Sequence, residues 1–298
     1  GEEFYGWTSL PNGANPSFRG SRTEAFEGAT RGTVAMNVPE IDLPFIRPMM
    51  EYGVSAIPEQ PAAVVVRNAT VWSQGPLGLM ENADLLIQAG TIVAVGPDLD
   101  APRGAIEIDA TGKHVTPGLI DPHIHSGVSA INESGFAIVP EVQMGDVVTH
   151  NNIWMYRQLA GGLTTAHIKH GSANPIGGEN VFVKMRWGSL PEDLKLEGAP
   201  RTVKFALGEN VKQSNWGDEY TTRYPQTRMG VEQIMRDGFQ RAIQYRQDWA
   251  DWKKTGKGIP PRHDLELEAL AEIVEGKRWI HCHSYRQDEI LALLRTLE

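Results

Sequence analysis

The sequence predicts an α/β protein in which a small β-rich domain precedes a parallel α/β domain. Short β-type segments follow one another between residues 62 and 115. From residue 116 onward, strands alternate with helices, which is typical of a parallel sheet covered by helices. The pair His123 and His125 at the end of the first of these strands is the third observation, because it indicates a metal site there.

The composition favours an ordinary soluble protein and excludes several functions. The 298 residues are 41% hydrophobic and 22% charged, and the net charge of −9 disfavours binding to nucleic acid or to an anionic membrane. Cys282 is the only cysteine, so no internal disulfide forms, and no apolar run approaches the roughly 20 residues of a membrane span. Because the chain begins with Gly1, we expect a processed or excised polypeptide, either cytoplasmic or exported.

Three parts follow one another along the chain. Residues 1–61 are rich in Gly, Pro and Asn, and we expect an irregular N-terminal extension there. Residues 62–115 hold β-type segments at 63–71, 83–88, 91–95 and 105–109, punctuated by glycines. They predict a small antiparallel sheet in a domain of the β-sandwich type.

Residues 116–298 contain the alternating strands and helices. The expected strands are 119–125, 163–168, 181–185, 201–207 and 278–283. Helices are expected near 146–159, through 231–243, at 265–274 and at 288–297, where apolar residues recur with a period near 3.6. This part therefore corresponds to about five βα units.

Two pairs of histidines stand at the ends of expected strands. Residues i and i+2 of a strand face the same side, so His123 and His125 point at one place, and so do His281 and His283. Convergent imidazoles of this kind are half of a zinc, iron or manganese site. The alternative is a set of hydrogen-bonded structural histidines.

Three motifs resemble the amidohydrolase superfamily, in particular its imidazolonepropionase-like and dipeptidase-like branch. They are Thr116-Pro117-Gly118-Leu119-Ile120-Asp121-Pro122-His123-Ile124-His125, Gly161-Gly162-Leu163-Thr164-Thr165, and His283-Ser284-Tyr285-Arg286-Gln287-Asp288-Glu289-Ile290. The resemblance covers residues 62–298. It implies a TIM barrel that hydrolyses its substrate with one or two divalent transition metal ions, zinc being the first candidate.

The resemblance also implies roles for individual residues. His123 and His125 would bind one metal, and His283 would bind a second, whereas His281 lies one pleat deeper, where we expect it to support a ligand or to pack and not to bind metal itself. A carboxylated Lys or a Glu would bridge the metals. Lys204 is one candidate, because Val203, Phe205 and Leu207 form an apolar face and leave Lys204 to the barrel interior, where a bare ammonium is costly. The alternatives are an interior carboxylate paired with Lys204, and Glu209 as the bridge at the carboxyl end of the same strand.

Three residues are candidates for substrate binding. Asn174 lies in a glycine-rich loop after the second strand, and Tyr285 follows His283. Arg223 lies in a long insertion and could hold a substrate carboxylate through two hydrogen bonds. The alternatives are a plain turn for the loop and a solvated side chain for Arg223.

The barrel is expected to be incomplete in this chain. Eight βα units need roughly 250 residues, whereas about 180 follow Leu119. No sixth-strand histidine and no general-base Asp can be assigned, so no catalytic residue is named. We expect a second chain or a C-terminal fragment to complete the barrel, and homo-oligomers are left open.

The predicted function is metal-dependent hydrolysis of an amide, peptide or cyclic-amide C–N bond in a small-molecule or peptide substrate. A metal-activated water would be the nucleophile. Two alternatives remain at this stage: a hydrolytic deaminase of a ring C–N bond, and a non-catalytic barrel remnant that serves as a binding or scaffold subunit.

Overall fold

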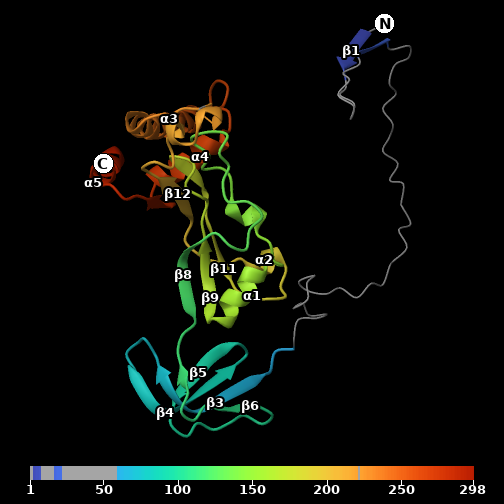
Figure 1. Cartoon of the computed structure of the whole chain (residues 1–298), viewed down its shortest axis with the longest axis vertical. Helices are drawn as coiled ribbons and strands as arrows, with labels where there is room; N and C mark the ends of the chain where they lie inside the picture. The colour runs from blue at the N-terminus through green and yellow to red at the C-terminus, as the bar shows by residue number, and fades with distance from the viewer. Residues whose placement is uncertain (1–2, 8–16, 22–58, 221) are drawn as a thin grey trace. The chain divides into compact units, whose positions relative to one another are not determined.

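The computed structural model describes residues 3–7, 17–21, 59–220 and 222–298 (Figure 1). The chain divides into two compact units, Gly1–Leu43 and Pro44–Glu298. In the first unit, β1 (Glu3–Trp7) and β2 (Ser17–Ser21) pair antiparallel. The expectation of an irregular extension over residues 1–61 did not include this hairpin, because five-residue strands are too short for a clear alternation. Most of that extension lies outside the described residues.

Five strands between residues 63 and 115 form one sheet of mixed direction. They are β3 (Ala63–Trp72), β4 (Leu79–Gln88), β5 (Thr91–Gly96), β6 (Ile106–Asp109) and β7 (His114–Val115). The strand order is β5-β4-β3-β6, and both β6 and β7 run parallel to β3. The expectation of a purely antiparallel sheet is therefore wrong: after β5 the chain crosses back and pairs on the free side of β3. The β-sandwich stays a prediction.

Strands and helices alternate in the rest of the described chain. The strands are β8 (Leu119–Ile124), β9 (Leu163–Ile168), β10 (Ile176–Glu179), β11 (Val181–Lys184), β12 (Thr202–Ala206) and β13 (Trp279–His283). The helices are α1 (Ile153–Ala160), α2 (Pro191–Leu194), α3 (Arg228–Thr255), α4 (Leu265–Val274) and α5 (Gln287–Leu297), with 3-10 turns η1 (Met144–Val147), η2 (Gln213–Asn215) and η3 (Asp218–Tyr220).

The strands pair in two parallel couples that an antiparallel segment joins. β8 pairs parallel with β9, and β12 pairs parallel with β13. Between them, β11 runs antiparallel to β9, and β10 runs antiparallel to β12. The strand expected at 181–185 is therefore present but does not begin a parallel βα unit. No helix lies among the described residues between β9 and β11: the chain turns back after β9, passes through β10 and then runs antiparallel along β9 as β11.

Asn180 lies where this joining segment changes partner from β12 to β9. Its backbone N–H donates to the carbonyl of Thr202, and its side-chain nitrogen donates to Thr202 Oγ1 at 2.9 Å. Its side-chain oxygen accepts from the backbone N–H of His170 at 3.0 Å. One buried amide group thus ties the end of β9 to the start of β12.

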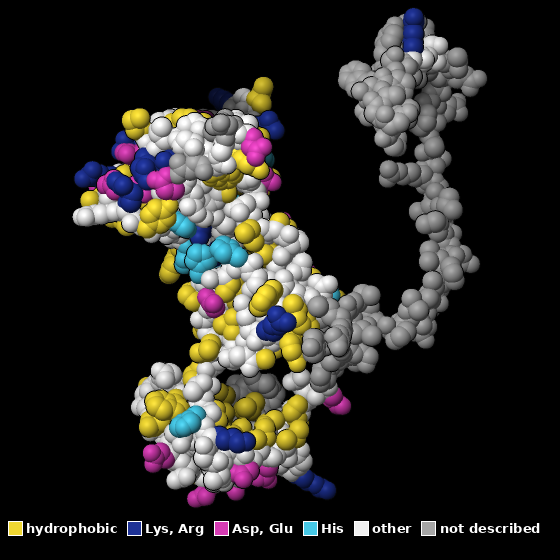
Figure 2. Space-filling view, in the orientation of Figure 1, with side chains coloured by type: hydrophobic (Ala, Val, Ile, Leu, Met, Phe, Trp, Pro, Cys, Tyr) yellow, Lys and Arg dark blue, Asp and Glu magenta, His cyan; other side chains and the backbone are white. Residues whose placement is uncertain are grey.

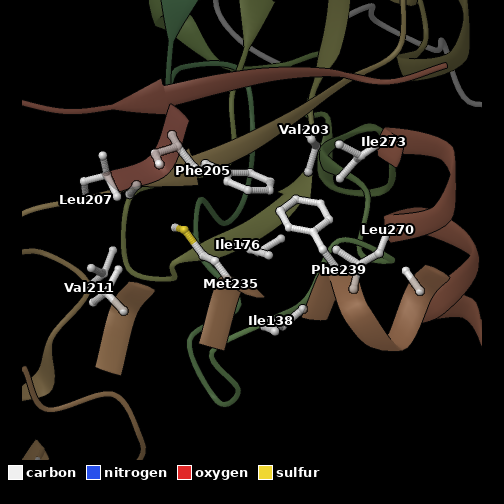
Figure 3. Close-up of a cluster of buried hydrophobic side chains, with 14 of the residues drawn as sticks. Ile138, Ile176, Val203, Phe205, Leu207, Val211, Met235, Phe239, Leu270 and Ile273 are labelled. Atoms are coloured by element: carbon white, nitrogen blue, oxygen red, sulfur yellow. The ribbon is translucent and has the colours of Figure 1, made fainter. Parts of the chain in front are cut away.

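Two hydrophobic clusters support the two couples. In the first, Val203 and Phe205 of β12 pack against Met235 and Phe239 of α3 and Leu270 of α4 (Figure 3). The second joins β8, β9 and β11 to α1 and α2. Its fully buried members include Ala166, Ile168, Val183 and Leu194. The alternation in β12 therefore leaves Lys204 on the opposite face from the helices, as the sequence predicts.

The longest helix has a defined beginning and end. Thr227 Oγ1 accepts a hydrogen bond from the Gly230 backbone N–H at the start of α3, and Gly256, with φ of 60°, follows its last residue. Among the described residues, no helix is both long enough and apolar enough to cross a membrane.

Candidate metal centre

His123 and His125 lie side by side at the carboxyl end of β8. Their Nε2 atoms are 3.2 Å apart, and their rings meet edge to face with centroids 5.0 Å apart. His125 Nδ1 lies 2.9 Å from the backbone oxygen of Lys169. That contact assigns the proton to Nδ1 and leaves the Nε2 lone pair of His125 free to bind a metal.

Lys204 reaches the same place from β12. Its Nζ is 3.2 Å from His123 Nε2, and the residue is only 2% exposed. Burial lowers the pKa of Lys204, and the described structure gives it no ion pair with a carboxylate. The predicted alternative, an interior carboxylate paired with Lys204, therefore has no support among the described residues.

Three further histidines lie near this histidine pair. His167 of β9 stacks on Phe182 with ring centroids 3.7 Å apart, and its Nε2 lies 2.8 Å from Thr202 Oγ1. The ring of His281 meets the ring of His167 edge to face, with centroids 4.9 Å apart. The buried Nε2 of His283 has no hydrogen-bond partner within the described part of the chain. Figure 2 shows histidine side chains gathered on one face of the molecule.

These groups surround a cavity of about 230 Å³. Its lining residues are Pro122, His123, Lys169, Lys204, His281 and Cys282. Burial, with a contribution from the Lys204 ammonium, lowers the pKa of His123 to about 4, so its imidazole is neutral at pH 7. Burial raises the pKa of the Cys282 thiol to about 12, so the thiol is protonated at pH 7.

The donor set fits a divalent metal on one condition. Among the described residues, no group of three or more His, Cys, Asp and Glu side chains is arranged to hold a metal. The two neutral imidazoles of His123 and His125 are a pair of suitable donors, and the orphaned Nε2 of His283 offers another on β13. The anionic ligand that a bridged site needs would be Lys204 in its carboxylated form, because the cavity lining contains no carboxylate.

Glu209 is held elsewhere. Its carboxylate pairs with Arg228 and with Lys212, whose Nζ lies 2.8 Å from Glu209 Oε2. These cations lower the pKa of Glu209. Glu209 does not line the cavity of the histidines and lines a separate open pocket with Asn132, Ser172, Ala173, Asn210 and Trp216.

The three residues expected to bind substrate have different surroundings. The side-chain nitrogen of Asn174 donates to the carbonyls of Glu133 and Phe136 at 2.6 and 2.7 Å. The Arg223 guanidinium donates to the carbonyls of Ser134 and Ala173.

Asn174 and Arg223 therefore hold loops together. Tyr285 is the candidate that lies next to a proposed metal ligand: its ring meets the His283 ring with centroids 5.3 Å apart. Its hydroxyl accepts from the Glu209 backbone N–H at 2.8 Å.

Lys169 is a residue of this site that the sequence analysis did not single out. It is 2% exposed, and it lines the cavity beside Lys204. The signal was present in the alternation of the second strand, because Lys169 continues the face of Thr165 and His167 just beyond the strand end.

Several known proteins are similar to parts of this chain. No protein-family model matches the chain. The amidohydrolase tasK of Hapsidospora irregularis is 30% identical over 271 aligned positions, covering 77% of this chain and 27% of tasK. The imidazolonepropionase of Geobacillus kaustophilus is 54% identical over 56 positions, which cover 16% of this chain and 13% of that enzyme.

A solved structure shares the fold. An amidohydrolase from Thermotoga maritima superposes with a TM-score of 0.70 and 30% identity, over 78% of this chain and 61% of its own. This chain is α/β with mixed sheets, and both relatives support the amidohydrolase superfamily. It spans only part of the length of each of these relatives.

Proposed function

We propose that this chain is the metal-binding part of an enzyme that hydrolyses an amide, peptide or cyclic-amide C–N bond. The observation that carries the proposal is the approach of a buried lysine to a histidine pair. Lys204 Nζ lies 3.2 Å from His123 Nε2, which in turn lies 3.2 Å from His125 Nε2. Relatives named amidohydrolase, imidazolonepropionase and dihydroorotase are all hydrolases of this chemical type.

Each residue has a distinct role in this proposal. His123 and His125 would hold one divalent ion, with His125 oriented by the carbonyl of Lys169. Lys204, carboxylated, and His283 would be further ligands, while His281 packs against His167. When bound, the metal, of which zinc is the first candidate, supplies Lewis acidity that activates water and polarises the substrate carbonyl.

The bridge is assigned to Lys204 and not to Glu209 because of their surroundings. The Glu209 carboxylate is paired with Arg228 and Lys212, and it would have to leave both cations to bind a metal. A buried ammonium without an ion pair loses nothing when it is converted to an anion that a metal neutralises.

The open edges of the strands support a barrel that other strands complete. Leu119 and Ile120 of β8 are 61% and 65% exposed, and Trp279 of β13 is 64% exposed. β8 and β13 stand at the two outer positions of the described strand arrangement. Large apolar side chains on unpaired edges are unfavourable in water, so further strands from a continuation or a second chain would cover them. Residues 62–115 would form the accompanying β-sandwich-type domain.

The substrate is proposed to be a small molecule or a peptide. Its reacting carbonyl would enter beside His123 and Lys204, with Tyr285 next to His283 at the rim. Asn174 and Arg223 would contribute by fixing the loops over that entrance. The general base would come from the strands that complete the barrel.

Metal analysis combined with a substrate panel tests this function. The full-length protein is loaded with zinc, and its metal content is measured by mass spectrometry. It is then offered N-acyl amino acids, dipeptides, cyclic amides and aminated heterocycles. The proposal expects bound metal and new carboxylate product from one of the first three classes. Ammonia release from the heterocycles alone would identify a deaminase instead, and absence of both metal and turnover would identify a scaffold.

A further inference from the structure

Lys169 presents a second buried lysine to the cavity that holds Lys204. Lys169 and Lys204 are each 2% exposed, and both line the same space of about 230 Å³. The buried Nζ of Lys169 has no hydrogen-bond partner in the described part of the chain. The other lining residues are Pro122, His123, His281 and Cys282, so the lining offers no negative charge to either lysine.

Two uncompensated cations in one buried cavity are electrostatically unfavourable. Each loses hydration, and each repels the other through a medium of low dielectric constant. The main chain of Lys169 is held beside the histidine pair, because its N–H donates to the Ile124 carbonyl at 3.0 Å and its own carbonyl lies 2.9 Å from His125 Nδ1. The backbone of Lys169 is therefore held by Ile124 and His125.

We propose that Lys169 is a positioning residue whose ammonium pairs with a carbamate on Lys204 and favours its formation. This inference rests on the proposed function, because it assumes that Lys204 carries the bridging group. The co-reactant is carbon dioxide. The neutral Lys204 amine attacks the carbon of CO2, an N–C bond forms, one C–O π bond becomes the lone pair of a carboxylate oxygen, and the nitrogen releases a proton to solvent.

The reaction changes the charge pattern of the cavity. Before it, two basic side chains line one cavity whose lining holds no counter-ion. After it, Lys204 is an anion and Lys169 supplies the matching cation, so the repulsion becomes an attraction. Lys169 thus would act before any metal binds, through its side chain on Lys204 and through its backbone on His125.

Carbon-13 NMR of the metal-free full chain in labelled bicarbonate measures the carbamate directly. We expect one carbamate signal in the wild-type protein and its loss in Lys204→Met. Lys169→Met should lower carbamate occupancy about tenfold at equal bicarbonate, since it removes one partner of a buried charge pair. Lys169→Arg keeps the positive charge and should restore most of the signal. Lys195→Met, which removes a lysine paired with Glu192 at 2.7 Å, is the matched control.

Several results would overturn the inference. Wild-type occupancy in Lys169→Met would show that the ammonium does not matter, and equal loss in Lys169→Met and Lys169→Arg would show a packing effect. If Lys169→Met fails to fold by circular dichroism, Lys169→Gln takes its place in the same comparison. A wild-type chain that binds metal and cleaves amides without any carbamate signal would remove this inference and leave the proposed function standing. A chain that shows the carbamate signal but neither binds metal nor turns over substrate would remove the proposed function and leave this inference standing.

Discussion

Lys204 of β12 lies directly opposite His281 of β13 in the parallel register of the two strands. Two residues farther along, Ala206 lies opposite His283, so both histidines share the face of Lys204. The other face of β12 carries Val203 and Phe205, which pack into the helices. This strand pair therefore separates a hydrophobic core from a row of basic groups.

His123 and His125 should bind metal but contribute little to the stability of the fold. We expect His123→Ala/His125→Ala to reduce bound metal to about a tenth or less of the wild-type content, because both are ligands in the proposed site. The melting temperature of the metal-free chain should change little, since more than a third of each residue is accessible to solvent and neither belongs to a hydrophobic cluster. Metal analysis and thermal unfolding measure the two effects. His114→Ala/His263→Ala removes two histidines elsewhere and should keep its metal; full metal content in the first variant would end the assignment.

Removing the buried charge of Lys204 should stabilise the metal-free chain. Lys204→Met keeps the length of the side chain and eliminates an ammonium that is only 2% exposed. We expect the free energy of unfolding in urea to rise by about 1–3 kcal/mol in the absence of bicarbonate and metal, and metal binding to weaken. Lys195→Met should change neither quantity. A loss of stability in Lys204→Met would mean that the ammonium has a favourable partner.

Acid should destabilise the metal-free chain in a defined pH window. Burial lowers the pKa of His167 from 6.5 to about 3 in the folded chain. Between these values the unfolded chain binds a proton that the folded chain does not, so stability is fully present above pH 6.5 and falls as the pH drops toward 3. The contribution of one such group is about 1.4 kcal/mol per pH unit.

Urea unfolding across that window, with His167→Gln as the comparison, checks the sign and the size. The glutamine amide can still donate to Thr202 Oγ1, but it does not titrate. The free energy of unfolding of the His167→Gln variant should fall less steeply with acid than that of the wild type. Parallel curves for the two proteins would show that His167 is not the group responsible.

Gly208 should be intolerant of a side chain because Tyr285 covers it. Gly208 has φ of 81°, and a Cβ atom there would lie 2.5 Å from Tyr285 Cζ. Gly104 has a similar φ of 79° with nothing within 4 Å of such an atom, so Gly104→Ala measures the backbone cost alone. We expect Gly208→Ala to lose about 1–3 kcal/mol more than Gly104→Ala in urea unfolding. Equal losses would mean that Tyr285 moves aside freely.

Elements with strong local signals were predictable from the sequence. The helix at 265–274 was expected with the bounds that the structure has, because its apolar residues repeat helically and Gly276 follows it. Strand direction was not predictable in this way. The segment 181–184 has the same β pattern in either direction, and only its pairing with β9 decides that it runs antiparallel.

The parts of the site that depend on a single strand were predictable from the sequence. His123 and His125 share a face because of the two-residue period of a strand, and the same period places Lys204 opposite the core. The partners of Glu209 were not predictable, since Arg228 comes from the start of α3. The lack of a partner for Lys169 Nζ was not predictable either, because it depends on which groups β8, β12 and β13 bring to the cavity.

The change of strand partner at Asn180 divides the sheet into two halves, each with a hydrophobic cluster of its own. Such halves can open one at a time, so the amides of β8 and β9 should exchange with deuterium as one group and those of β12 and β13 as another. His123 belongs to the first half and Lys204 to the second. A metal held by both would fasten the halves together, and the two exchange groups would merge into a single cooperative unit.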